Sequence, residues 1–120
     1  MVHSVLGEFK KLPARFFRSD TGKEPVRDWL LGLAEGDRKA IGHDIRTAEF
    51  GWPIGMPLCR KIAGRAGLWE IRTNLPGGNI ARVFFCAHDG SMVLLHGIIK
   101  KTQKTPPKEL DVAVRRMKGL

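Results

Sequence analysis

The spacing of the apolar residues changes once along the chain, near residue 57, and this change constrains the fold more than any other feature. Before it, apolar residues recur every three or four positions, as on one face of a helix. Two helices are predicted there, the first opening at Pro25 and the second ending near Gly51. After it, apolar and polar residues alternate, as they do in strands. Helices and strands in separate blocks are typical of an α+β fold.

The alternating segments predict an antiparallel sheet of about four strands. These are expected at residues 58–63, 68–74, 80–87 and 92–99. A further strand at 12–18 precedes the helices, with Pro13 at its beginning or on an edge because proline cannot donate a ladder hydrogen bond. Pro106 and Pro107 open a C-terminal helix whose apolar face consists of Leu110, Ala113, Val114 and Met117.

Length and composition indicate one globular domain over residues 1–120, since the chain holds 42% hydrophobic residues and no internal repeat. The longest mostly apolar run, 92–99, is shorter than the ~20 residues of a membrane-spanning helix. Residues 1–8 lack the pattern of a secretion signal. Cys59 and Cys86 have no zinc-ligand spacing. We therefore expect a cytoplasmic protein with reduced thiols, no bound metal and no cofactor.

The charge is unevenly distributed. The chain carries a net charge of +9, and its first 50 residues contribute nine Lys/Arg against eight Asp/Glu. Residues 51–120 contribute twelve Lys/Arg against four Asp/Glu, a net charge of +8. Such asymmetry is typical of a surface that binds a polyanion, because each neutralised phosphate releases counterions. The alternative is a solvated basic surface that only aids solubility.

Alternation along the strands also predicts which residues share a sheet face. One face is expected to meet the helices through Trp69, Ile71, Val83, Phe85, Val93 and Leu95. The opposite face then carries Arg72, Arg82 and His96. Charged side chains in a strand centre must reach solvent or pair, so this face is predicted to be open. With Lys100 and Lys101 just beyond the third strand, it forms a basic cleft with one imidazole.

These residue types suit phosphate chemistry. Arginine donates two parallel hydrogen bonds to phosphate oxygens, so Arg72 and Arg82 can clamp one phosphate. Arg72 can instead form a structural ion pair with Glu70. His96 can transfer a proton near neutral pH, or it can be a structural residue. Lys100 can contact phosphate or, with a lowered pKa, act as a base.

Several segments resemble a known family. The sheet segments read GLWEIR at 67–72, IARVFF at 80–85 and VLLHGIIKKTQKTP at 93–106. GKEPV at 22–26 and the Gly-x-Pro-x-Gly-x-Pro pattern at 51–57 fit as well. From about residue 12 to 117, the chain resembles the RelE/HigB toxin superfamily, and within it the HigB-like branch of phage-derived proteins.

The resemblance implies a small RelE-like fold and the toxin of a type II toxin–antitoxin system. Such toxins are mRNA interferases: endoribonucleases that act on the ribosome without a metal ion, through attack of the ribose 2′-OH on the adjacent phosphate. The implied partners are a cognate antitoxin of helix-turn-helix type and the ribosome with its mRNA.

By position, the resemblance also assigns roles to individual residues. The implied catalytic residues are Arg72, Arg82, Lys100 and His96, and the implied RNA-binding residues are Arg60, Lys61, Lys101 and Lys104. Some members of the superfamily rely on a C-terminal tyrosine, and this chain contains none. Two other functions stay open: a non-catalytic RNA- or ribosome-binding module of phage origin, and a phage structural or accessory protein.

Overall fold

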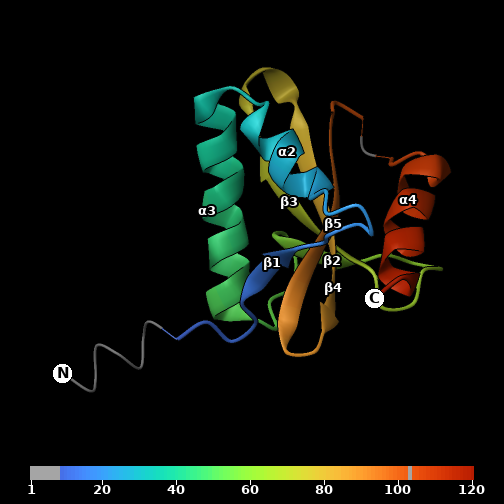
Figure 1. The fold of residues 1–120 in the computed structure, drawn as a ribbon. Helices are drawn as coiled ribbons and strands as arrows, with labels where there is room; N and C mark the ends of the chain where they lie inside the picture. The colour runs from blue at the N-terminus through green and yellow to red at the C-terminus, as the bar shows by residue number, and fades with distance from the viewer. Residues whose placement is uncertain (1–8, 103) are drawn as a thin grey trace.

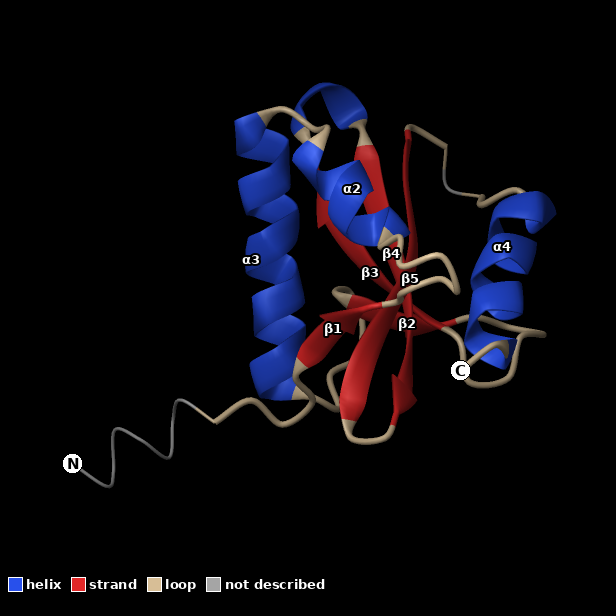
Figure 2. Ribbon diagram, viewed as in Figure 1, coloured by secondary structure: helices blue, strands red, loops and turns tan. Residues whose placement is uncertain are grey.

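The computed structural model describes residues 9–102 and 104–120, so the N-terminal residues 1–8 and Gln103 of the basic segment lie outside it. The predicted α+β fold is confirmed (Figures 1 and 2). The strands are β1 (Ala14–Phe16), β2 (Cys59–Lys61), β3 (Trp69–Asn74), β4 (Ile80–His88) and β5 (Ser91–Lys100). The helices are α2 (Pro25–Leu31), α3 (Glu35–Gly51) and α4 (Pro107–Lys118). None of these helices is long and apolar enough to cross a membrane.

The strands form one five-stranded sheet in the order β1-β5-β4-β3-β2. Strands β2 to β5 are antiparallel, as predicted, whereas β1 lies parallel to β5 at the sheet edge. Pro13 immediately precedes β1, and its carbonyl accepts a hydrogen bond from the Met92 amide (2.8 Å). The turn between β3 and β4 contains Gly77 and Gly78, whose φ angles of 76° and 78° suit glycine.

Helices cover both faces of the sheet. In Figure 2, α2 and α3 lie on one side and α4 lies on the other. The α4 face buries Leu68, Phe84, Cys86, Val93 and Leu95 against Ala113. The prediction of an open face opposite α2 and α3 is therefore wrong. The apolar stripe of α4 needs a partner, and this sheet face offers enough apolar side chains to provide one.

A β-bulge corrects one further prediction, which concerned β5. The pairing shifts between Phe84, which faces His96, and Phe85, which faces Leu94. The extra residue reverses the alternation of side chains from that point. Val93 and Leu95 therefore join the α4 core rather than the α2/α3 core.

Candidate nucleic-acid-binding site

The strand register places the predicted charged residues in two neighbouring rows on the α4 face. The rows run across the sheet, each through directly paired residues. The first row consists of Arg60, Glu70, Phe84 and His96, and the second of Arg72, Arg82 and Ile98. The predicted grouping of Arg72, Arg82 and His96 on one face is confirmed. The bulge reverses the alternation only for the residues paired beyond Phe84 and His96, so these three keep their predicted face.

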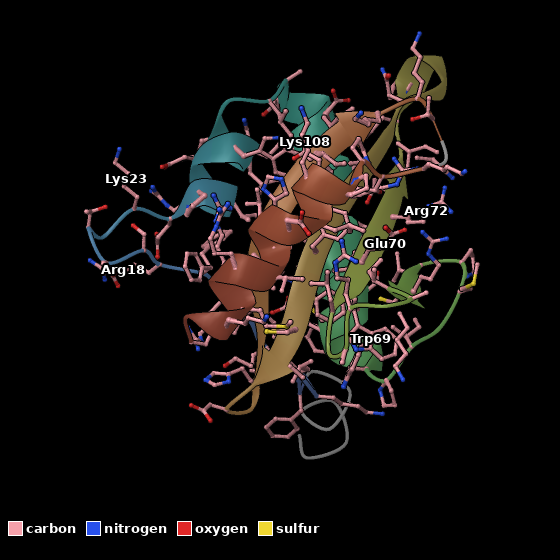
Figure 3. The ribbon with its side chains drawn as sticks, turned by 90° about the vertical axis from the view of Figure 1, so that its right-hand side faces the viewer. Arg18, Lys23, Trp69, Glu70, Arg72 and Lys108 are labelled. Carbon is pink, nitrogen blue, oxygen red and sulfur yellow. The ribbon has the colours of Figure 1, made fainter. Side chains whose placement is uncertain are left out.

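Glu70 lies at the centre of the arginines. Its carboxylate is fully buried, and one oxygen, Oε1, is 3.2 Å from Nη2 of Arg60 and 3.8 Å from Nε of Arg72. The two arginine side chains are 40% and 21% exposed, so both also reach the surface. Figure 3 shows Glu70 and Arg72 close together beside α4. The structural ion pair considered for Arg72 is thus present, and Arg60 shares it.

Arg82 is fully buried, unlike Arg60 and Arg72. Its Nη2 donates a hydrogen bond to the Thr102 carbonyl (2.7 Å), in the segment that joins β5 to α4. Burial lowers the pKa of Arg82, the charges of Arg72 and Arg60 add to this, and Glu70 opposes it. Arg82 therefore supports the site from within the protein in this conformation.

His96 belongs to a network that attaches α4 to the sheet. Its Nε2 is 2.7 Å from Oε1 of Glu109, and its Nδ1 is 3.4 Å from Nη1 of Arg116. Arg116 also donates a hydrogen bond to the Leu95 carbonyl (2.7 Å). Because Arg116 can only donate, Nδ1 accepts and Nε2–H donates to the carboxylate. The hydrogen bond from His96 lowers the pKa of Glu109. Both ring nitrogens of the predicted proton donor are thus engaged within the protein.

The lysines are more widely distributed than the arginines. Lys61 pairs with Trp69 across β2 and β3, and its Nζ lies 6.0 Å from the centroid of the tryptophan ring. It therefore projects to the sheet face opposite that of Arg60. Lys100 is partly exposed at the end of β5, whereas Lys101 and Lys104 are exposed beyond it.

Two hollows flank the arginines. A groove of about 570 Å³ lies between β2 and the start of α4, and it is lined by Arg60, Lys61, Ile62, Ala63, Lys104, Thr105, Pro107 and Leu110. A second hollow of about 300 Å³ is lined by Asp44, Pro57, Leu58, Arg72 and Asn74. Arg60 borders the first and Arg72 the second, while both contact Glu70. Each of the two arginines that contact Glu70 therefore borders its own hollow.

The structure brings together Arg60, Arg72 and Arg82 around Glu70, and Arg60 with Lys104 in the groove. Lys61 borders the groove, but its ammonium group lies on the opposite face, over Trp69. It places His96 in a separate network. The sequence interpretation missed the central position of Glu70, although a usable signal existed: an acidic residue in a strand centre shares its alternation with two arginines. It also missed Glu109 and Arg116, which only the docking of α4 brings to His96.

Among residues 9–102 and 104–120, no group of His, Cys, Asp or Glu side chains is arranged to hold a metal ion.

The fold and the site define a small α+β protein with an arginine-rich, partly exposed surface around a buried carboxylate. Comparison with protein families identifies its relatives. The chain belongs to the family described as "Phage derived protein Gp49-like (DUF891)", whose model matches residues 28–118. This family lies in the RelE/toxin-like group and is compatible with a toxin of a toxin–antitoxin system. The matched range contains Arg60, Glu70, Arg72 and Arg82. No match was found among curated proteins.

Proposed function

We propose that this protein is the toxin of a type II toxin–antitoxin system, from the HigB-like branch, and that it cleaves mRNA on the ribosome without a metal ion. Family membership supports the toxin assignment. The observation that carries the nuclease assignment is the convergence of Arg60 and Arg72 on Glu70, with each arginine bordering a hollow. Paired, partly exposed guanidinium groups are well suited to a phosphodiester.

In the proposed reaction the ribose 2′-OH attacks the adjacent phosphorus, and its proton passes to a base. The bond to the 5′-oxygen breaks, and that oxygen takes up a proton. The products are a cyclic phosphate and a 5′-OH end. Arg72, with Arg60, stabilises the charge that develops on the phosphate. Lys100 is the candidate for proton transfer, because the imidazole of His96 is held by Glu109 and Arg116.

The surrounding lysines supply affinity rather than chemistry in this proposal. Lys104 lines the groove beside Arg60, and Lys101 lies on the exposed segment after β5. Lys61 borders the same groove, with its ammonium group on the Trp69 side of the sheet. Binding of RNA by these residues falls as salt rises. The protein has few groups for proton transfer, so cleavage depends on a ribosome that holds the 2′-OH in line with its phosphate. The proposed location is the cytoplasm, and the proposed inhibitor is a helix-turn-helix antitoxin.

The test is induced expression in bacteria, with growth recorded and mRNA 5′ ends mapped. We expect growth arrest and new 5′-OH ends within codons, both lost in Arg72→Ala. A purified assay then compares one mRNA, naked and bound to programmed ribosomes, at equal protein concentration. We expect efficient cutting only on ribosomes. We also expect it to persist in excess EDTA, when the ribosomes are reassembled so that their own magnesium requirement is met. Growth arrest without new 5′ ends would contradict the nuclease proposal.

A second candidate function is a non-catalytic RNA- or ribosome-binding module. One observation favours it: both ring nitrogens of His96 are engaged by residues of α4, Glu109 and Arg116. Such a module would bind ribosomes through the same basic surface and leave mRNA intact. The 5′-end map therefore separates the two candidates.

A further inference from the structure

We infer that Glu70 is a positioning residue of this site: its buried carboxylate holds the guanidinium groups of Arg60 and Arg72 from the protein side, so that both are presented to an RNA phosphate. This inference rests on the proposed function, which assigns the two arginines to the scissile phosphate. It assigns Glu70 a specific part in the reaction, beyond its part in folding.

The burial of the three side chains supports this arrangement. Glu70 has no exposed surface, whereas Arg60 and Arg72 are 40% and 21% exposed. The contacts with Glu70 therefore lie on the inner side of both guanidinium groups. A guanidinium carries five N–H donors in a fixed plane, so one that contacts Glu70 can also bind a phosphate. A single oxygen, Oε1, contacts both arginines, and it thus couples the orientation of one to that of the other.

The charges explain why an anion is needed at this point. Arg72 and Arg82 are directly opposite each other, and like charges in that arrangement destabilise a sheet. Arg60 lies in the adjacent row, paired with Glu70 itself. Glu70 offsets part of this repulsion and leaves the cluster with a surplus of positive charge. The cluster is therefore both ordered by its own carboxylate and attractive to a phosphate.

This dual role predicts opposite effects on binding and on cleavage. Glu70→Gln keeps the shape of the side chain and removes the charge, so the site gains one unit of positive charge. We expect RNA affinity to rise and to depend more steeply on salt. We expect ribosome-dependent cleavage to fall by roughly a hundredfold, because displacement of a catalytic group by about 1 Å has an effect of that size.

The experiment measures two quantities on each full-length variant. Affinity for a short single-stranded RNA is measured by fluorescence anisotropy over a range of salt concentrations, and cleavage is measured on mRNA in programmed ribosomes. Glu35→Gln is the matched control, because it adds the same charge at an exposed position on α3, where Glu35 pairs with Lys39. We expect this control to change cleavage little.

A folded Glu70→Gln protein that cleaves at the original rate, or that loses affinity and cleavage together, would overturn the inference. If this variant does not fold, Glu70→Asp replaces it. That variant keeps the charge but withdraws the carboxylate by one methylene group. We therefore expect unchanged RNA affinity and reduced cleavage. Unchanged cleavage would overturn the inference. Absence of cleavage by the unaltered protein would contradict the proposed function itself, and the positioning role would fall with it.

Discussion

Arg72 on β3 and Arg82 on β4 are direct cross-strand partners, yet they occupy very different environments. The side chain of Arg72 is 21% exposed and contacts Glu70, whereas Arg82 is fully buried and donates to the Thr102 carbonyl. Two residues that look equivalent in the sequence therefore have different relationships to solvent. Substitution of each should produce a different kind of defect.

Arg72→Ala is expected to keep the fold and to lose function. The partly exposed guanidinium contributes little to the core, but removal of one donor to a transition state lowers a rate by ~10²–10³. Circular dichroism would establish folding, and growth after induction together with ribosomal cleavage would report function. A folded Arg72→Ala protein that remains fully toxic would exclude Arg72 from the reaction.

Arg82→Ala is expected to act mainly through stability. Removal of one partner from a buried charged cluster costs about 3–5 kcal/mol in free energy of unfolding, and here the Thr102 carbonyl also loses its donor. Urea denaturation of the purified protein measures this loss directly. A change below about 1 kcal/mol would mean that the buried guanidinium contributes little to the fold. The sequence alone predicted an open sheet face, and on that basis a fold unaffected by this substitution.

The contact between His96 and Glu109 predicts a dependence of stability on pH. The folded-state pKa of Glu109 is lowered below its ordinary value of 4.5. The stability that it contributes is therefore fully present above about pH 4.5, and is lost as the pH falls through the folded-state pKa. In Glu109→Gln the pair has no carboxylate charge at any pH. Urea denaturation should show the largest difference in free energy of unfolding between the unaltered protein and Glu109→Gln near neutral pH, and a smaller difference in acid. A difference that does not change with pH would contradict this role for the charge.

Two glycines give a matched pair of stability predictions. A Cβ atom at Gly97 would overlap the ring of Trp29, which packs α2 on the sheet, so Gly97→Ala should lower the free energy of unfolding by about 1–3 kcal/mol. Gly42 lies in the middle of α3 with open space around it, and Gly42→Ala should raise stability by roughly 0.5–1 kcal/mol. Thermal or urea denaturation would distinguish them. Equal effects of the two substitutions would mean that α2 does not pack against Gly97 as described.

The two thiols are expected to be unreactive in the native protein. Burial, with a contribution from the Asp44 carboxylate, raises the pKa of Cys59 to about 11, and burial also raises the pKa of Cys86. The thiolate is the reactive form, so both cysteines should react slowly with an aromatic disulfide at mildly alkaline pH. Addition of denaturant should release two rapidly reacting thiols. Rapid reaction of the native protein would show that one of these thiols is accessible.

The sequence by itself determined the elements and their order. Alternation in the segments around Trp69, Val83 and Leu94, and the three-to-four spacing around Ile41 and Leu110, are local properties that each segment carries wherever it lies. The placement of Arg72, Arg82 and His96 on one face followed from the same alternation of side chains along each strand. The turn at Gly77 and Gly78 is local as well, since few other residues accept positive φ.

The tertiary structure alone decided what covers that face and how its charges pair. The bulge after Phe84 moved Val93 and Leu95 to the α4 core, and no local pattern specifies an inserted residue. In the folded protein Glu70 and Arg82 are buried, and the docking of α4 engages His96 with Glu109, a residue thirteen positions away. Burial and pairing depend on contacts between segments that are distant in the chain. The alternation of its strand therefore predicts that Arg82 is exposed, whereas the tertiary structure buries it and pairs it with the Thr102 carbonyl.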